Sequence, residues 1–285
     1  MDGEWSDEIP IWIIQRKIRD ALGMVNIDLN SGIQRWKWVN IPHPKDNTKI
    51  ELKMRFNIKD MPEKELYLLT ENINEMISLK LNNKEIPIKD DGWFIDKSLR
   101  KIPLKEFKIG ENIIEILLNY KNSTELEDFY IIGDFAVNID REIIKENNRI
   151  TLGDWVYQGY PHYAGSLIYK QIFPFHKDPN EKYLLTIEDF FAEVIKVNIN
   201  GETVGFIPWK FYKLDISDYL NNGDNLLELE VVGSLRNMLG PLHHRAKKIH
   251  FVSAHSFRPE GEEYTKAYVF HSYGLFSPVK IEVIG

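Results

Sequence analysis

The stretch IKVNINGETV (residues 195–204) has the pattern of a strand, a tight turn and a returning strand, because apolar and polar residues alternate on both sides of Asn-Gly. The stretch ISLKLNNKEI (77–86) repeats this pattern in the first half of the chain. A period of two is typical of a β-strand with one buried face. These segments therefore predict hairpins at the centre of two similar β-structures.

The other short strands recur in the same order in both halves. The offset between the copies stays between 113 and 118 residues for the first four pairs and widens to 141 at the last, which predicts an insertion at 234–265 in the second copy. Besides the central hairpins, the pairs are TKIELKMRF (48–56) with GSLIYKQIF (165–173), LYLLT (66–70) with KYLLT (182–186), GENIIEILL (110–118) with GDNLLELEV (223–231), and FYIIGDFAV (129–137) with FHSYGLFSPV (270–279).

We therefore predict an all-β fold of two tandem antiparallel β-sandwich domains with a short N-terminal helical segment. The predicted parts are an N-terminal helix and linker at 1–40, a first sandwich at 41–148 and a second sandwich at 149–285 that carries the insertion. The helix is expected to have Ser6 or Asp7 as N-cap, Pro10 in its first turn and Gly23 as its stop. Its apolar face consists of Ile11, Ile14, Ile18 and Leu22.

Composition excludes several classes of function. The 285 residues are 43% hydrophobic and 28% charged, as in a globular protein. A net charge of -7 without a basic face argues against nucleic acid, and no apolar run of about 18 residues predicts a membrane span. The lack of cysteine excludes disulfides and a cysteine nucleophile. With no leader pattern in MDGEWSDEIP, we expect a cytoplasmic protein, or a secreted one if a parent protein carries a signal peptide.

Three stretches carry a family resemblance. LGDWVYQGYPHYAGSLIYKQIF (152–173) and the segment from 195 to 231 resemble the galactose-binding-like jelly roll of glycoside hydrolase family 2. SLRNMLGPLHH (234–244) is similar to large bacterial hydrolases of the α-L-rhamnosidase type. The resemblance implies sugar-binding modules that accompany a catalytic barrel, but the chain lacks the alternating strand and helix pattern of such a barrel. We therefore expect the chain alone to be non-catalytic and its parent to be a glycoside hydrolase.

Two groups of side chains are candidates for glycan contact, because aromatic rings stack on sugars and polar groups bind hydroxyls. Alternatively, the aromatic residues fill the space between the domains, and the polar residues pair with carboxylates or cap backbone carbonyls. The first group is Trp155, Tyr157, Tyr160, His162 and Tyr163, and the second is Arg236, Asn237, His243 and His244. Trp93 and Trp209 occupy matching places after the two hairpins, which favours packing in the core or at its rim.

No cofactor is expected except a structural ion. The family resemblance implies calcium near the first turns of a jelly roll, with Asp134, Asp154 and Glu188 as possible oxygen ligands. A zinc site is disfavoured, because His-x-His and HExxH spacings are absent. Clusters of carboxylates elsewhere are expected to be solvated turns.

Three hypotheses of function follow. The first is a non-catalytic region of a glycoside hydrolase that braces the catalytic domain and borders its glycan cleft, with the glycan and that domain as partners. The second is an independent pair of carbohydrate-binding modules. The third is an assembly module that uses the N-terminal helix with Trp36 and Trp38 to hold another protein.

Overall fold

The computed structural model describes residues 5–26, 39–147, 149–246, 249 and 251–284. It divides into two compact units, residues 1–135 with 141–145 and residues 136–140 with 146–285. Strands dominate both units, so the all-β sandwich prediction is confirmed. Trp36 and Trp38 lie outside the described residues. Within the described part, no helix has the length and apolar character needed to cross a bilayer.

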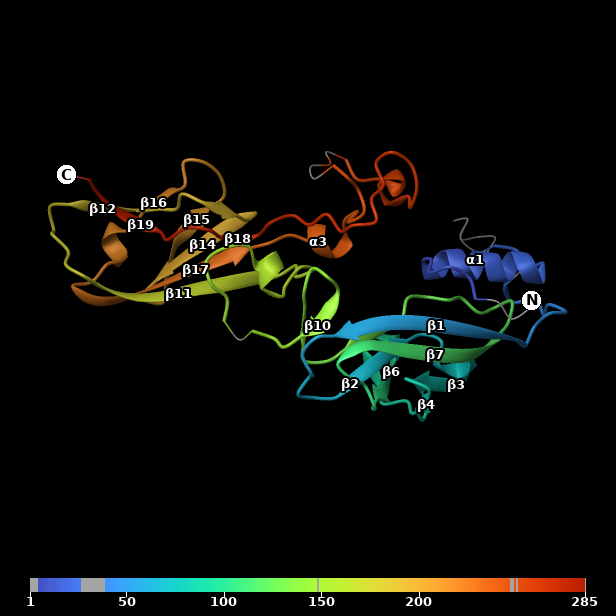
Figure 1. Ribbon diagram of the computed structural model, residues 1–285. Coiled ribbons are helices and arrows are strands. Elements are labelled where there is room, and N and C mark those ends of the chain that lie inside the picture. Colours follow the sequence, from blue (N-terminus) through green and yellow to red (C-terminus); the bar gives the residue numbers. More distant parts are fainter. Residues whose placement is uncertain (1–4, 27–38, 148, 247–248, 250, 285) are drawn as a thin grey trace. The chain divides into compact units, whose positions relative to one another are not determined.

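Two sheets enclose the core of the first unit (Figure 1). One runs in the order β4-β3-β7-β1-β10 and the other in the order β5-β6-β2-β8. The elements are β1 (Thr48–Ile58), β2 (Leu66–Thr70), η1 (Ile73–Glu75), β3 (Met76–Leu81), β4 (Lys84–Glu85), β5 (Trp93–Phe94), β6 (Asp96–Leu104), β7 (Gly110–Tyr120), β8 (Tyr130–Ile132) and β10 (Glu142–Ile144). Neighbouring strands in these sheets pair antiparallel, except β1 and β10, which pair in parallel.

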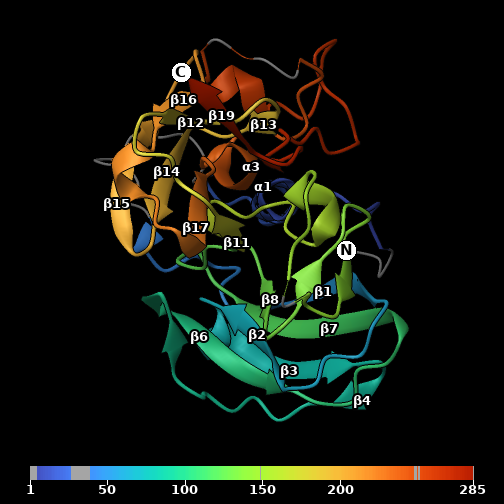
Figure 2. The same ribbon diagram turned by 90° about the vertical axis from the view of Figure 1, so that its left-hand side faces the viewer.

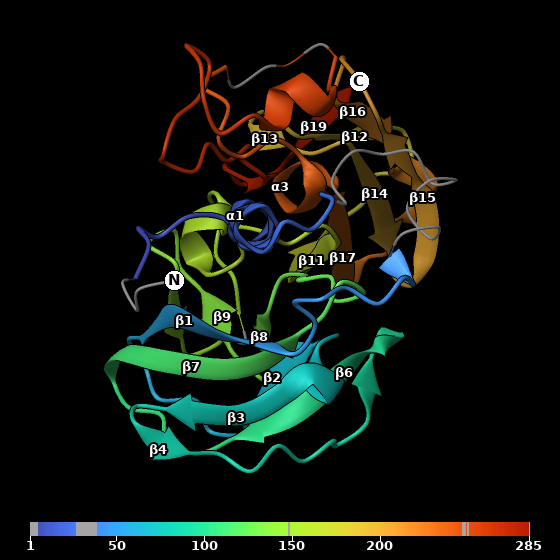
Figure 3. The same cartoon turned by 90° about the vertical axis from the view of Figure 1, so that its right-hand side faces the viewer.

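The second unit has a sheet in the order β11-β17-β14-β15 and a second layer in the order β16-β12-β19, seen as separate layers in Figures 2 and 3. A short pair, β13-β18, completes it. The elements are β9 (Ala136–Val137), η2 (Trp155–Gln158), β11 (Ser166–Phe175), β12 (Lys182–Thr186), β13 (Phe190–Phe191), β14 (Val194–Ile199), β15 (Glu202–Ile207), β16 (Lys213–Asp215), η3 (Ser217–Tyr219), β17 (Gly223–Val232), α3 (Arg236–Leu239), η4 (Ala254–Phe257), β18 (Gly274–Leu275) and β19 (Lys280–Ile284).

The two units share one strand order. The run β1-β7-β3-β4 of the first unit corresponds to β11-β17-β14-β15 of the second, and β6-β2-β8 corresponds to β16-β12-β19. The register agrees as well, because Phe56 lies opposite Asn112 in one unit and Phe173 lies opposite Asn225 in the other.

Alternation along the central strands explains how each core forms. In β7 every second residue from Asn112 to Tyr120 is buried, and in β17 the same holds from Asn225 to Val231. The apolar side chains on these faces meet those of the opposite sheet, and their burial provides the main driving force for folding. A shift of one residue in register would turn both sets toward water.

The helix α1 (Ile11–Leu22) packs on the first unit, above β1 in Figure 1. Its Ile18 is buried in that unit's core, and Ile11, Ile14 and Leu22 pack against it. The predicted stop is confirmed, since Gly23 is the C-cap with a φ of 69°. The predicted start was wrong: Pro10 is the N-cap, because its extended backbone (ψ 144°) begins the helix later than Ser6 or Asp7 would.

This packing removes the main support for the assembly hypothesis, which needs an unpartnered apolar face on the helix. That face is covered by the chain's own sandwich. A fully buried cation, Arg19, ties the helix further to the unit through hydrogen bonds to the side-chain and main-chain oxygens of Asn122 at 2.7 and 3.0 Å.

Candidate functional site

The aromatic turn at 155–163 begins with η2, which Asp154 caps. The Asp154 carboxylate accepts hydrogen bonds from the backbone N–H groups of Val156 at 3.0 Å and Tyr273 at 3.3 Å. Gly159 ends η2 with a φ of 101°, a conformation that favours glycine. Asp154 therefore fixes the turn to the strand segment near Tyr273.

The aromatic side chains of this turn differ in exposure. Trp155 is fully buried and stacks on Tyr273 with ring centroids 5.6 Å apart, so a glycan cannot reach it. Tyr157 is 71% exposed. Tyr160 is half-buried and donates a hydrogen bond to the carbonyl of Asn147 at 2.8 Å, and Tyr163 donates to the carbonyl of Ser166 at 3.0 Å.

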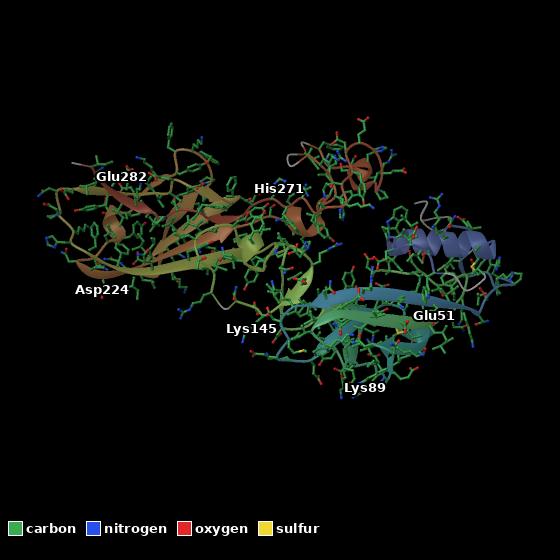
Figure 4. The ribbon with its side chains drawn as sticks, in the orientation of Figure 1. Glu51, Lys89, Lys145, Asp224, His271 and Glu282 are labelled. Atoms are coloured by element: carbon green, nitrogen blue, oxygen red, sulfur yellow. The ribbon has the colours of Figure 1, made fainter. Side chains whose placement is uncertain are left out.

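The segment between β17 and β18 lies at one end of the second unit. Figure 4 places His271 beside α3 at this end, away from Asp224 and Glu282. Asn237 is fully buried and clamps the segment, because its amide donates to the His271 carbonyl at 2.7 Å and accepts from the His271 N–H at 2.8 Å. Asn237 is thus a structural residue with no group left facing solvent.

Histidine and aromatic rings form a cluster at the same end. His162 lies edge-on to Tyr268 and Phe270, and His243 lies 4.7 Å from Tyr268. The Nδ1 atoms of His162 and His243 contact the carbonyls of Asn237 and Thr265 at 2.9 and 3.0 Å. A carbonyl can only accept, so both rings carry a proton on Nδ1.

His244 is bonded differently. Its Nδ1 accepts from the Ala246 N–H at 3.2 Å and lies 3.9 Å from the Glu263 carboxylate. The structure therefore joins His162, Asn237 and His243 into one cluster with Tyr268, and it gives His244 a separate environment.

Arg236 is a half-buried cation beside Gly240. Its Nη1 is buried without a hydrogen-bond partner among the described residues, and its Nη2 makes only a long bond of 3.4 Å to the Pro241 carbonyl. Burial lowers the pKa of the guanidinium, because it disfavours the charged form.

The three carboxylates predicted as calcium ligands are each engaged by protein groups. Asp134, in the first unit, pairs with Lys64, and Asp154 caps η2 as described. Both oxygens of Glu188 accept from Lys280 at 2.7 Å. Over the described parts of the chain, no group of three or more His, Cys, Asp or Glu could hold a metal ion. Bound calcium therefore stays a prediction that rests on the family resemblance.

A groove of about 910 Å³ runs along β11, the edge strand of the second unit. Asn147, residues 149–152, and β18 with the residues after it form its other walls, and buried Leu227 and Leu229 of β17 line it inside. Its remaining lining residues are Asn147, Arg149, Ile150, Leu152, Tyr160, Leu167, Ile168, Tyr169, Lys170, Gln171, Leu275, Pro278 and Val279.

The groove combines an apolar floor with few polar groups. Tyr160 and Tyr169 provide rings, and burial raises the pKa of the Tyr169 hydroxyl, which accepts from the Leu275 N–H at 3.3 Å. Asn147, Arg149 and Gln171 provide donors and acceptors. Of these residues, the sequence analysis predicted only Tyr160 as a glycan contact, because strand pairing and loop positions bring the other lining residues together.

No known protein-family model and no curated protein matches the chain. The similar solved structures include a rhamnosidase from Novosphingobium sp. PP1Y, with 15% identity, a TM-score of 0.34, and coverage of 83% of this chain and 22% of that one. They also include an alpha-L-rhamnosidase from Streptomyces avermitilis, with 10% identity, a TM-score of 0.23, and coverage of 66% of this chain and 22% of that one. A lectin from Pleurotus ostreatus has 10% identity and a TM-score of 0.19, with coverage of 66% of this chain and 68% of that one. The chain thus spans 22% of the length of either rhamnosidase. At these identities and TM-scores, the similarities assign the chain neither to a family nor to a function.

Proposed function

We propose that the chain is a non-catalytic carbohydrate-binding region and that the groove along β11 is its glycan site. The lining of this groove carries the proposal, since it joins tyrosine rings and an apolar floor to the hydrogen-bonding side chains of Asn147, Arg149 and Gln171. Sugars present apolar C–H faces and a ring of hydroxyls, so they need both kinds of surface. A volume of about 910 Å³ falls within the range of ~300–1,000 Å³ that is common for ligand sites.

Binding without hydrolysis fits the charges of the groove. A glycoside hydrolase places two carboxyl groups about 5–9.5 Å apart beside the scissile bond. The lining residues that the structure describes include no Asp or Glu. Lys170 at the rim is already paired with Glu228 at 2.6 Å.

As the broader role, we propose that the chain accompanies and braces the catalytic domain of a glycoside hydrolase. The sequence resemblance at 152–173 and 195–231 supports this role. A second support is the apolar surface of the segment between β17 and β18, since exposed apolar clusters often mark a protein partner. The side chains concerned, each more than half exposed, are Leu235, Met238, Leu239, Phe251 and Phe257.

The test is calorimetric titration of the whole chain with a panel of oligosaccharides. We expect the double variant Arg149→Ala/Gln171→Ala to weaken binding of the recognised glycan by about tenfold or more, the loss of about 1.4 kcal/mol of hydrogen bonding. The control Lys182→Ala, which changes an exposed residue of β12 outside the groove, should bind like the wild type. Unchanged binding by the double variant, or site-dependent turnover of aryl glycosides by the wild type, would overturn the proposal.

A further inference from the structure

Trp93 lies exposed on the edge strand β5 of the first unit. Its side chain is 50% exposed and that of Phe94 is 44% exposed, so the indole lies outside the buried core. Trp209 is 75% exposed as well. An exposed indole on a strand edge offers a flat apolar surface held by the sheet.

Arg100 stands next to this indole. It is the cross-strand partner of Trp93 on β6, and directly opposed residues of an antiparallel pair share one face of the sheet. The guanidinium binds Asp90 through Nε at 2.9 Å and Nη2 at 2.6 Å to the same oxygen. The Gly92 N–H donates to the other oxygen of Asp90 at 3.0 Å. The ion pair is therefore fixed in place beside the ring.

The guanidinium of this ion pair keeps bonding capacity. It has five N–H groups, and the bonds to Asp90 and to the Lys97 carbonyl at 3.3 Å use one each on Nε, Nη1 and Nη2. The carboxylate has about four lone-pair positions, and four contacts occupy them, because Nε also lies 3.1 Å from Oδ1. The Arg100 side chain is 29% exposed, so a ligand on Trp93 can reach the N–H groups that remain on Nη1 and Nη2.

We propose that Trp93, Asp90 and Arg100 form a second sugar-binding site, on the first unit. A pyranose would lay its apolar C–H face on the indole and place two neighbouring hydroxyls on the remaining N–H groups of the guanidinium, which Asp90 holds in position. Such charge-assisted hydrogen bonds are about twice as strong as neutral ones. This inference rests on the proposed glycan-binding function, and it gives the first unit a recognition role in place of a purely supporting one.

The sugar class is neutral. Asp90 already neutralises Arg100 at a distance of 2.6 Å, so no free positive charge remains there for the carboxylate of an acidic sugar. Asp91 and Asp96 flank β5 and would repel such a sugar.

The chain contains a matched control. Trp209 is more exposed than Trp93, but its loop at 208–212, PWKFY, holds no carboxylate and no arginine. If sugars bound non-specifically to any exposed tryptophan, replacing either residue would weaken binding equally. A specific sugar site requires Trp93 together with its ion pair.

The experiment titrates neutral oligosaccharides into the full-length double variant R149A/Q171A, in which the groove is impaired, and follows heat and tryptophan fluorescence. We expect binding to persist in this background. Trp93→Ala and Arg100→Lys should each weaken sugar binding about tenfold or more. Lysine keeps the positive charge but lacks the planar set of N–H groups of the guanidinium. Trp93→Phe should retain part of the affinity, and Trp209→Ala should retain all of it.

The outcomes separate the two proposals. Loss of all binding in R149A/Q171A, with wild-type affinity in Trp93→Ala, overturns the second site and supports the groove. Equal losses in Trp93→Ala and Trp209→Ala also overturn the second site. Binding that depends on Trp93 and not on Arg149 and Gln171 supports the second site and overturns the groove. A wild-type chain that binds no sugar overturns both.

Discussion

The side chain of Asn200 donates a hydrogen bond to Oδ1 of Asn225 over 2.9 Å, and the buried Asn225 amide is bonded in turn to its own loop. Asn225 accepts from the Asn221 N–H at 2.8 Å and donates to the carbonyls of Asn221 and Gly223. Asn200 also accepts from the Leu226 N–H at 3.0 Å. This network ties the β14–β15 turn to the start of β17.

The first unit contains the same network. Asn82 donates to Asn112 over 2.9 Å and accepts from the Ile113 N–H, while Asn112 bonds to the N–H and carbonyl of Lys108 and to the Gly110 carbonyl. Both Asn82 and Asn200 adopt a positive φ, 52° and 54°, which asparagine tolerates better than most residues. Agreement at this level supports the predicted tandem relation between the units.

Asn225→Ala is expected to destabilise the chain by about 3 kcal/mol, because it removes the four hydrogen bonds that this buried side chain makes to Asn200 and to its own loop. Asn112→Ala should have a similar effect. Denaturant unfolding measures both. The control Asn222→Ala removes a side chain on the surface of the same loop that accepts one bond from the Lys177 N–H, and should cost about 1 kcal/mol or less. A loss for Asn225→Ala no larger than for Asn222→Ala would contradict the role of the network.

The fold was largely predictable because it follows from local rules. The alternation of apolar and polar residues predicts the strands, and Asn-Gly and Asn-Asn predict the turns. The recurring order of the strand segments predicts two similar cores. The helix start was not predictable in the same way. Ser6 and Asp7 are good N-caps by type, yet the helix begins only after Pro10, where its apolar face reaches the sandwich.

Arg19 illustrates a further limit of sequence reasoning, since nothing in its neighbourhood marks it as buried. Its Nε donates to the Val25 carbonyl at 2.6 Å, and other bonds reach Tyr120 and Asn122, more than 100 residues away. We expect Arg19→Ala to lower the free energy of unfolding by about 3 kcal/mol or more, because it leaves a cavity and unpaired carbonyls.

Thermal and denaturant unfolding of Arg19→Ala would be compared with Lys17→Ala, an exposed cation on the same helix whose loss should change stability by about 0.5 kcal/mol or less. The stability of Arg19→Lys should be close to that of the alanine variant, since one ammonium group cannot make the several directed hydrogen bonds of the guanidinium. If Arg19→Ala unfolds like Lys17→Ala, α1 does not depend on this anchor.

The candidate site was predictable only in part. The aromatic turn stands out in the sequence, but burial divides its members: Trp155 enters the core, whereas Tyr160 reaches the groove. Strand pairing, and not spacing, brings Arg100 beside Trp93. Such cross-strand sites leave no contiguous motif.

Variants of Trp155 test whether this buried member of the aromatic turn has a structural role and no part in glycan binding. Trp155→Ala should cost about 3–5 kcal/mol through the cavity it creates. Trp155→Phe should cost clearly less, because the indole Nε1 is buried without a hydrogen-bond partner among the described residues and its loss breaks no bond. Glycan affinity of the folded Trp155→Phe protein should equal that of the wild type.

Tyr157→Ala is the control from the same turn, and with 71% exposure it should unfold like the wild type. A Trp155→Phe protein of normal stability that no longer binds glycan would show instead that the indole contacts the sugar.

The pH dependence of the second site follows from Asp90. The hydrogen bonds from Arg100 hold the pKa of Asp90 below its usual value of 3.8, so the stabilising ion pair is present above that value and is lost as the pH falls through the lower folded-state pKa. Sugar affinity in the R149A/Q171A background should therefore be constant from about pH 7 to about pH 5 and fall only below the usual pKa. Titrations at three pH values check this, with Asp90→Asn expected to bind weakly at all of them. A fall between pH 7 and pH 5 would require a histidine to titrate at the site and would contradict this assignment.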